Sequence, residues 1–176
     1  MRRVCVFCGA SSGARSAYAE AARAFGATCA ARGLGVVYGG GRVGLMRAVA
    51  DGALLAGGEV FGVIPQDLVD RELAHPGLTE LHVVSSLHER KALMAELSDA
   101  FVALPGGFGT LDELVEIITW RQLELHAKPI GLLDAAGFWD PFAVLVEHLR
   151  TAGFLRVDPG EILRDDDAER LVGRVV

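Results

Sequence analysis

"LPGGFGTLDE", residues 104–113, joins an apolar run to a segment with helical periodicity. The run before it, Ala100–Leu104, is short and apolar, as is typical of a buried β-strand. After it, apolar residues recur at spacings of three and four from Leu111 to Leu125, which predicts a helix. A strand that passes through a glycine-rich turn into a helix is the repeating unit of a parallel α/β sheet.

The same alternation of strand and helix continues in both directions along the chain. Further strands are expected at Val4–Phe7, Leu34–Tyr38, Glu59–Ile64, Leu81–Val84, Ile130–Leu133 and, weakly, Glu161–Arg164. Further helices are expected at Tyr18–Arg32, Leu45–Leu55, Leu87–Leu97, Phe142–Leu149 and in a short acidic segment at the end of the sequence. No repeat or linker divides the chain. We therefore expect residues 1–176 to form one domain, a Rossmann-like α/β fold with a doubly wound parallel sheet and helices on both faces. Ligands of such folds bind outside the carboxyl ends of the strands.

Composition excludes several classes of function. The chain has 176 residues, of which 51% are hydrophobic, enough for one globular domain with a substantial core. A net charge of -6 provides no basic face for nucleic acid. The apolar runs are far shorter than the ~20 residues that span a membrane, and the run in "MRRVCVFC" is too short for a signal peptide. We expect a cytoplasmic protein that binds neither nucleic acid nor membrane.

Cysteine and histidine give no sign of a disulfide framework or a metal site. The cysteine count is three, an odd number. Cys5 and Cys8 fit C-x-x-C, but in a strand positions three apart point to opposite faces, which favours reduced core cysteines over a redox pair. The five histidines have no ligand spacing. We expect no metal and no cofactor.

"VVYGGGRVG" places Gly39, Gly41 and Gly44 in a G-x-G-x-x-G pattern between a strand and a helix. A dinucleotide fold usually has this pattern after its first strand and an acidic residue at the end of the next strand, and both features are missing here. Two alternatives stay open. The glycines allow close packing of helix on strand, or they let bare backbone at Gly40 and Gly41 approach a phosphate or ribose.

The turn "PGGFGT" predicts an anion site. Its missing Cβ atoms let backbone N–H groups from Gly106 onward converge on an anion, and the following helix adds the positive end of its dipole. Thr110 adds a hydroxyl. No G-K-[ST] follows, so a single phosphate is expected instead of a triphosphate with magnesium. One or two glycines suffice for a structural turn, and three favour a ligand.

Glu113 has a structural alternative. Thr110-Leu-Asp-Glu113 matches a capping box, in which the glutamate bonds back to the amide of the N-cap residue. Asp112 could equally be there because an acidic side chain interacts favourably with the positive end of the helix dipole. Capping and a chemical role can coexist at this position.

Arg90 and Lys91 follow a second capping box, Ser86-x-x-Glu89, near the start of a helix. Cations are disfavoured there by about 0.3–1 kcal/mol each. Arg90 also borders the apolar stripe of Leu87, Met94 and Leu97. The two cations either extend to water from the edge of that stripe or are compensated by an anionic or electron-rich ligand. We favour the ligand.

The helix that begins after the turn has apolar residues on more than one side. Leu111, Leu114, Val115 and Ile118 face one way and Ile117 and Trp120 another. Burial on two sides in a small protein predicts a subunit interface. A second core contact within the monomer is the alternative.

The motifs "GGGRVGLM", "HERKALM" and "PGGFGTLDELVEIITW", in this order, resemble the LOG (Lonely Guy) family of cytokinin riboside 5'-monophosphate phosphoribohydrolases. The resemblance extends from "VCVFCGASSG" to about Leu149. It implies hydrolysis of the N-glycosidic bond of a nucleoside 5'-monophosphate, plain AMP included, to free base and ribose 5-phosphate. It also implies a homodimer. The family was formerly labelled lysine decarboxylase. Lys91 and Lys128 are the only lysines, so a pyridoxal phosphate aldimine has two candidate partners, and we do not expect one.

The resemblance assigns catalysis to Arg90 and Glu113. The substrate contacts that it implies are Glu72, Lys91, Gly107, Phe108, Gly109, Thr110, Leu111, Asp112 and Thr119. The match around Glu72 is loose. Asp112 stands where many members have glutamate, which shortens one side chain and leaves Glu113 in place.

These residue types suit the implied chemistry. Breaking the glycosidic bond builds positive charge on the ribose, which a carboxylate kept ionised by a helix N-terminus could stabilise, or the carboxylate could activate water. Arg90 could bind the departing base or the phosphate. A nucleotide or molybdenum-cofactor carrier without catalysis is the alternative, and an NAD-dependent oxidoreductase is disfavoured.

Overall fold

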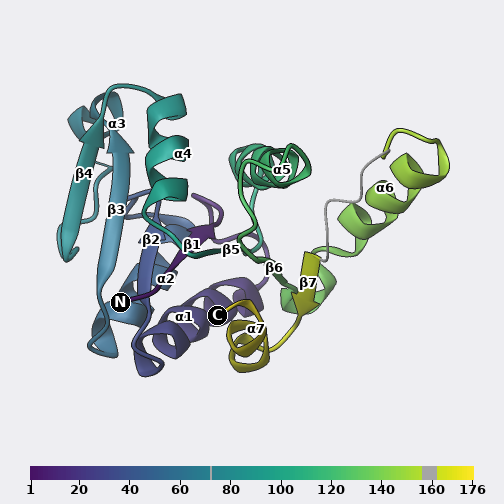
Figure 1. The fold of residues 1–176 in the computed structure, drawn as a ribbon. Helices are drawn as coiled ribbons and strands as arrows, with labels where there is room; N and C mark the ends of the chain where they lie inside the picture. Colours follow the sequence, from purple (N-terminus) through teal and green to yellow (C-terminus); the bar gives the residue numbers. More distant parts are fainter. Residues whose placement is uncertain (72, 156–161) are drawn as a thin grey trace.

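The computed structural model describes residues 1–71, 73–155 and 162–176, which form one parallel α/β sheet with its helices (Figure 1). The strands are β1 (Arg3–Phe7), β2 (Gly35–Tyr38), β3 (Val60–Pro65), β4 (Glu80–Val84), β5 (Ala100–Ala103), β6 (Ile130–Leu133) and β7 (Ile162–Asp165). The helices are α1 (Ser16–Ala31), α2 (Gly44–Leu55), α3 (Gln66–Asp70), α4 (Leu87–Glu96), α5 (Phe108–Gln122), α6 (Asp140–Thr151) and α7 (Ala168–Val175), with a 3-10 turn η1 (Ala135–Gly137).

The strand order is β4-β3-β2-β1-β5-β6-β7, and every pairing is parallel. The chain first builds outward from β1 to β4 and then crosses back to place β5 on the other side of β1. Val4 of β1 is therefore paired with Val36 of β2 on one side and with Ala100 of β5 on the other. The order reverses between β1 and β5, and the crevice at such a reversal is where open α/β sheets bind ligands.

Helices cover both faces of the sheet and enclose two apolar cores. On one face α1, α2 and α7 pack against the strands, with Phe25 and Leu171 among the fully buried side chains. On the other face α4 and α5 contribute Met94, Leu114 and Ile117 to a second core. Because helices cover both faces of the sheet, side chains on both sides of each strand are buried. This explains why the strands are continuous apolar runs and not alternating ones. The Rossmann-like, doubly wound fold expected from the sequence is confirmed.

The expected helices and strands are found, with shifts at their ends and two additions. α3 and η1 fall in segments that the sequence suggested were loops. The weak strand expected at 161–164 is β7, although Glu161 lies outside the described residues. The largest change concerns α5, which begins at Phe108 and not at Leu111. No helix among residues 1–71, 73–155 and 162–176 is long and apolar enough to cross a membrane.

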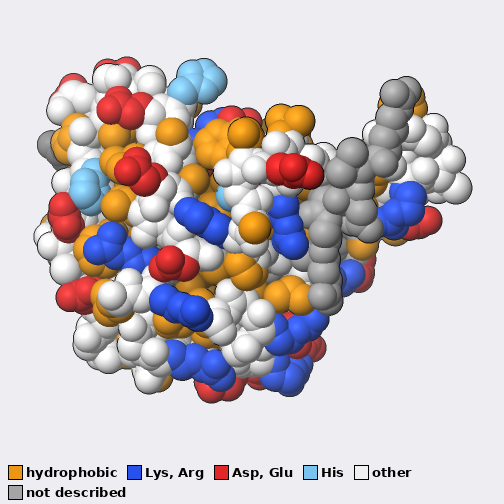
Figure 2. All heavy atoms as spheres, viewed as in Figure 1, with side chains coloured by type: hydrophobic (Ala, Val, Ile, Leu, Met, Phe, Trp, Pro, Cys, Tyr) orange, Lys and Arg blue, Asp and Glu red, His pale blue; other side chains and the backbone are white. Residues whose placement is uncertain are grey.

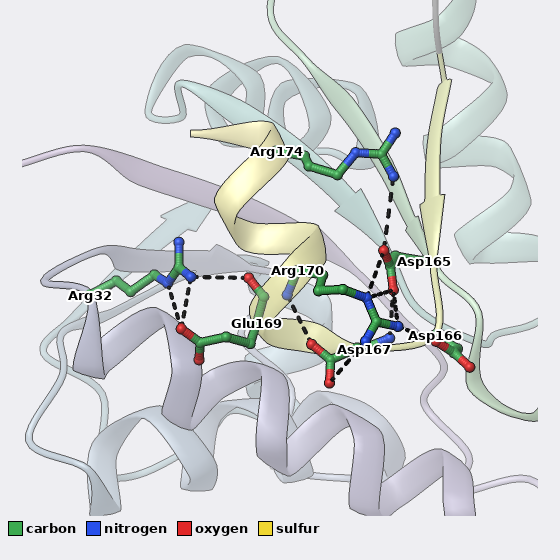
Figure 3. Close-up of polar contacts among 7 residues, drawn as sticks. All are labelled: Arg32, Asp165, Asp166, Asp167, Glu169, Arg170 and Arg174. Carbon is green, nitrogen blue, oxygen red and sulfur yellow. Dashed lines mark hydrogen bonds and ion pairs between the residues drawn. The ribbon is translucent and has the colours of Figure 1, made fainter.

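The C-terminal unit β7–α7 is fixed to the body by a core contact and by ion pairs. Leu171, Val172 and Val175 of α7 are buried against the α1 face of the sheet. Around them, Figure 3 shows Arg32 at the end of α1 reaching Glu169, at 2.7 Å, while Arg170 lies among the aspartates 165–167. The acidic segment is thus neutralised within the protein.

Some apolar side chains stay at the surface. Val115, Leu123 and Leu125 in or just after α5 and Val144 and Leu145 of α6 are exposed. Figure 2 shows apolar side chains at the surface over α5, between charged ones. α6 extends away from the sheet beyond β7 and buries none of its described residues (Figure 1). Leu114 and Ile117 of α5 face the core, so Val115 does not share the buried side that the sequence assigned to it.

Candidate active site

A cavity of about 520 Å³ lies where the chain leaves β1 and β5, at the reversal of the strand order. The loop of residues 8–13 after β1 forms one wall, and residues 105–110 after β5 form the opposite wall. The start of α2 and Arg90 of α4 complete the lining, with Phe138 after η1. The position agrees with the expectation that ligands bind at the carboxyl ends of the strands.

The three glycines of the 105–110 turn have different reasons to be there. A Cβ on Gly106 would lie 2.0 Å from Oγ1 of Thr110 and 2.9 Å from the backbone nitrogen of Gly9, so the two walls of the cavity meet at a bare Cα. A Cβ on Gly107 or Gly109 would meet nothing within 4 Å, and neither residue has a positive φ. Packing and backbone conformation therefore require one glycine of the three. The other two leave open space at the cavity wall.

The helix start faces this cavity. Gly107 is the N-cap of α5, and no side chain of the described residues caps it. The first amides of a helix have no partner within the helix. Leu111 is the first whose N–H donates back, to the carbonyl of Gly107 at 3.1 Å. The amides of residues 108–110 are thus left for a ligand, as the anion site requires.

The capping box expected at Thr110 and Glu113 is wrong. Because α5 begins at Phe108, Thr110 is its third residue and Glu113 lies in its second turn. The side chain of Glu113 is therefore not used as a cap. By contrast, the N-cap expected at the start of α4 is confirmed, since Oγ of Ser86 accepts the N–H of Glu89 at 3.1 Å. The carboxylate of Glu89 accepts the N–H of Ser85 at 2.8 Å, one residue before the N-cap, so the second bond of the expected capping box is shifted by one residue.

Arg90 and Glu113 meet at the back of the cavity. Nη2 of Arg90 lies 3.4 Å from Oε1 of Glu113, and the side chains are only 15% and 10% exposed. The Nε of Arg90 is buried and has no hydrogen-bond partner among the described residues. Arg90 therefore turns inward instead of extending to water, and it keeps one donor unused beside the cavity. An unpaired buried donor is costly, which favours a ligand acceptor at this point.

Burial sets the protonation of Glu113. Burial raises its pKa from 4.5 to about 7, against the opposite effect of the nearby Arg90 guanidinium. The sequence suggested a carboxylate held ionised by the helix N-terminus. This expectation is wrong, because the carboxyl lies a full turn inside the helix and is removed from water. A carboxyl with a pKa near neutrality can serve as acid or as base.

Lys91 is paired within the protein. Its Nζ lies 2.9 Å from Oδ2 of Asp112 and 3.0 Å from Oε2 of Glu116, so it links α4 to α5. Burial alone would lower the pKa of Lys91, but these two carboxylates outweigh it and raise the pKa. The sequence suggested that an anionic ligand compensates the charge of Lys91 near the helix start. Asp112 and Glu116 compensate it instead. Lys91 and Asp112 lie beside the cavity and not in its lining.

The other expected substrate contacts divide into two groups. Gly106, Gly107, Gly109 and Thr110 line the cavity with Arg90 and Glu113. Outside the lining are Phe108, which is 92% exposed, Leu111, Thr119, Gly40 and Gly41. Thr119 is exposed on α5, and its hydroxyl donates to the carbonyl of Val115 at 2.8 Å. Glu72 lies outside the described residues.

In the loop of residues 39–44, Gly39, Gly40 and Gly41 are buried, whereas Arg42 and Val43 are exposed. The N–H groups of Leu45 and Met46 at the start of α2 donate to the carbonyl of Gly9, at 2.9 and 3.3 Å. This helix N-terminus therefore binds the first loop, and is not free for a phosphate. Gly40 accepts the N–H of His75 at 2.9 Å, and Gly41 accepts the hydroxyl of Tyr38 at 3.1 Å. The close-packing alternative describes this loop better than a phosphate or ribose site.

Several cavity residues were missed in the sequence. The loop after β1 contributes Gly9, Ser11 and Ser12. Tyr18 and Phe138, whose rings meet edge to face at 5.7 Å, form an apolar end together with Leu45 and Met46. "CGASSG" does follow a predicted strand, which was a usable signal. The sequence does not show that β1 and β5 are neighbours, and only this neighbourhood brings the two loops together.

The positions of the cysteines and lysines argue against a redox pair and against a lysine bound to pyridoxal phosphate. Cys5 and Cys8 are buried, unpaired with each other and in different cores, on opposite faces of the sheet. Burial raises the pKa of the Cys8 thiol well above its usual range, which disfavours a redox role. Lys128 donates to the carbonyl of Ala95 at 2.8 Å, and like Lys91 it lies outside the cavity lining.

Comparison with known proteins gives a consistent result. The family model described as "Possible lysine decarboxylase" matches residues 46–173. The rice protein "Cytokinin riboside 5'-monophosphate phosphoribohydrolase LOG" is 46% identical over 162 residues, which cover 92% of this chain and 67% of the rice protein. The Arabidopsis thaliana protein of the same description, LOG3, is 44% identical over 162 residues and covers 92% of this chain and 75% of its own.

Solved structures share the fold at lower identity. The molybdenum cofactor carrier protein of Chlamydomonas reinhardtii superposes with a TM-score of 0.77 at 22% identity, covering 99% of this chain and 95% of the other. The molybdenum cofactor binding protein of Rippkaea orientalis gives 0.74 at 20% identity, with 99% and 94% covered. These similarities concern the fold alone. The sequence identities and the family model decide the relationship: the chain belongs to the LOG family.

Proposed function

We propose that this protein hydrolyses the N-glycosidic bond of cytokinin riboside 5'-monophosphates, and of AMP, to the free base and ribose 5-phosphate. The proposal follows the names of its relatives, which are phosphoribohydrolases at 44% and 46% identity. The observation that supports it most strongly is the pair Gly107 and Gly109. Neither packing nor φ requires these glycines, yet they lie at the N-terminus of α5 inside the cavity. A phosphate that approaches the bare backbone explains them.

The cavity offers a place for each part of the nucleotide. The phosphate binds the amides at the start of α5, where the helix dipole favours an anion. The base lies at the apolar end, against Tyr18, Met46 and Phe138. The ribose then lies between them, next to Arg90 and Glu113. The unused Nε of Arg90 provides a donor for the sugar, the base or the phosphate.

Arg90 and Glu113 supply the chemistry. The bond from C1′ to the base nitrogen breaks and its electron pair leaves with the base, so positive charge builds on the ribose. Ionised Glu113 stabilises that charge and accepts a proton from the water whose oxygen bonds to C1′. Arg90 donates to the electron-rich departing base or holds the phosphate in place, and the base takes up the proton that Glu113 accepted from the water, which restores the carboxylate. A pKa of about 7 lets Glu113 alternate between the two forms near neutral pH.

The lysine positions do not suit a decarboxylase that depends on pyridoxal phosphate. Such an enzyme needs a lysine amine at the cofactor carbonyl. Lys91 is held by two carboxylates and Lys128 by a backbone carbonyl, and neither lines the cavity.

The test is release of free base. Purified protein is incubated with N6-isopentenyl AMP, with AMP and with adenosine, and the base is measured by chromatography. We expect base from both monophosphates and much less from adenosine, which lacks the phosphate. Arg90→Ala and Glu113→Gln should lower kcat by at least about 100-fold. The exposed charges Arg23 and Glu96 provide matched controls, because Arg23→Ala and Glu96→Gln should keep normal turnover. Near-normal turnover in Glu113→Gln would contradict the catalytic role.

A carrier without catalysis is the competing function, and the solved carriers share this fold. It would show nucleotide or cofactor binding with no base released. We further propose that the protein acts as a homodimer in the cytoplasm. The exposed apolar side chains of α5 and α6 support the dimer, and the composition supports the compartment.

A further inference from the structure

Gly39, at the carboxyl end of β2, is a glycine that its own backbone does not require. Its φ is not positive, so any residue could adopt this conformation. The reason for glycine is a neighbour. A Cβ built on Gly39 would lie 1.8 Å from Nη2, 2.8 Å from Cζ and 3.4 Å from Nε of Arg90. The guanidinium of Arg90 therefore lies directly against the bare Cα of Gly39.

The loop behind Gly39 is fixed from the other side. The carbonyl of Gly40 accepts the N–H of His75 at 2.9 Å, and the carbonyl of Gly41 accepts the hydroxyl of Tyr38 at 3.1 Å. His75 is itself held, because its Nε2 lies 3.1 Å from Oδ1 of Asp51. These hydrogen bonds oppose a shift of the loop when a side chain is added. The end of an arginine side chain moves at lower cost, so we expect the added methyl group to displace Arg90.

The atom that would be displaced is the atom that meets Glu113. Nη2 of Arg90 is closest to the bare Cα of Gly39, and it also lies 3.4 Å from Oε1 of Glu113. Arg90 comes from α4, Glu113 from α5 and Gly39 from the end of β2. The same nitrogen of Arg90 is thus close both to the backbone of Gly39 and to the carboxylate of Glu113.

We propose that Gly39 is a positioning residue for the hydrolysis: its missing side chain provides the surface that holds the guanidinium of Arg90 beside Glu113. The proposal rests on the proposed function and assigns a role to the first glycine of the G-x-G-x-x-G pattern. That pattern then serves the reaction through Arg90 and not through contact with a phosphate.

Replacement of Gly39 by alanine has a defined effect. Nη2 must move by about 1.5 Å to reach an ordinary contact distance of roughly 3.4 Å from the new methyl group. A displacement of about 1 Å in a catalytic group can lower a rate by about 100-fold. We expect Gly39→Ala to lower kcat for N6-isopentenyl AMP by about 100-fold. Gly77→Ala is the matched control, since a Cβ there meets no atom closer than 3.5 Å and lies outside the cavity lining.

The pH profile separates displacement of Arg90 from general damage. The groups that act on the carboxyl of Glu113 are Arg90 and Lys91 from α4, Asp112 and Glu116 from α5, and it in turn acts on the thiols of Cys5 and Cys8. Of these, Arg90 contributes the largest lowering of the pKa of Glu113. Oε1 of Glu113 is already only 3.4 Å from Nη2, so Nη2 has little room to move towards it, and the displacement must separate the two groups and raise that pKa further. The limb of the kcat profile that reports Glu113 should therefore shift to higher pH in Gly39→Ala and stay unchanged in Gly77→Ala.

A stability cycle tests the same contact without any substrate. Melting temperatures are measured for the wild type, Gly39→Ala, Arg90→Ala and the double variant. We expect Gly39→Ala to lower the melting temperature by a few degrees in the wild-type background and to leave it unchanged when Arg90 is already alanine, because the clash has been removed. Equal decreases in both backgrounds would show that alanine disturbs the loop itself, and would overturn the proposal.

Failure of this inference differs from failure of the proposed function. If the wild type releases base and Gly39→Ala does so at a rate within about threefold with an unshifted pH profile, Gly39 does not position Arg90. If the wild type releases no base from any nucleoside monophosphate, the proposed function is wrong, and the stability cycle alone decides whether Gly39 holds Arg90.

Discussion

Glu113 should make the stability of this protein fall as pH rises through the neutral range. Its carboxyl is 10% exposed and its pKa is about 7 in the folded state, against 4.5 when unperturbed. Between these two values the unfolded chain has lost the proton while the folded protein still holds it. Proton loss therefore favours unfolding over this interval. Glu113→Gln, which has the same shape and no charge, should remove this dependence.

The size of the effect follows from the shift in pKa. One unit corresponds to about 1.4 kcal/mol, so a shift from 4.5 to about 7 amounts to roughly 3 kcal/mol in the free energy of unfolding. This contribution is fully present below pH 4.5, decreases from there to about pH 7, and is absent at higher pH. For a chain of this length, about 3 kcal/mol corresponds to a melting temperature difference of roughly 6–12 °C.

Urea denaturation between pH 4.5 and pH 8.5 measures this directly. Many carboxyls and histidines titrate in this range, so the useful quantity is the difference in unfolding free energy between wild type and Glu113→Gln at each pH. We expect Glu113→Gln to gain about 3 kcal/mol relative to wild type across the range. Glu96→Gln, at an exposed position on α4, controls for the loss of one carboxyl. A difference that does not change with pH would refute a buried, protonated Glu113.

Two further predictions concern the remaining surface and the C-terminal unit. If the exposed apolar face of α5 forms the dimer, Val115→Asp should reduce the mass measured by sedimentation to that of one chain and leave the melting temperature unchanged. Leu55→Asp, at an exposed position on α2, should leave the dimer intact. A dimer that survives Val115→Asp places the interface elsewhere. Leu171→Ala should lower the free energy of unfolding by about 2–5 kcal/mol, because the side chain of Leu171 is fully buried. Glu169→Ala removes the surface ion pair with Arg32 and should lower it by less than about 1 kcal/mol, and not at all in high salt. If urea denaturation shows the larger loss for Glu169→Ala, the C-terminal unit is not held mainly by its buried side chains.

The fold could be predicted from sequence because its signals are local. Each strand is a short apolar run, and most connecting segments show helical spacing, with Gly33 and Gly57 marking the ends of the first two helices. Continuous apolar strands can be buried only between two layers of helices, so the parallel sheet follows from the same pattern. The boundaries were less certain where two signals competed. At residues 108–113 the capping pattern suggested Thr110 as the N-cap and a helix start at Leu111, but Gly107 provides the N-cap, and the helix includes Phe108 and Gly109.

The site could be predicted only in part because it depends on neighbours in space. The turn at 106–110, Arg90 and Glu113 each have a local pattern that marks them, and the structure brings them into one cavity. The walls formed by Ser11, Tyr18 and Phe138 have no such pattern. They reach the cavity because β5 pairs with β1 and not with β4, which no local spacing reveals. The internal partners of Lys91 were missed for the same reason, since they come from the next helix.

The two turns are both rich in glycine but have different roles, and the difference lies in what each helix N-terminus faces. The amides at the start of α2 are occupied by the carbonyl of Gly9, and the backbone of Gly39 supports Arg90. The amides at the start of α5 face a cavity, beside Gly107 and Gly109. Neither packing nor backbone conformation requires a glycine at these two positions. A glycine pattern therefore identifies a ligand site only when the chain leaves both the amides and the space unfilled. By this criterion we propose one anion site in the cavity, which is what a nucleoside monophosphate requires and what a dinucleotide would exceed.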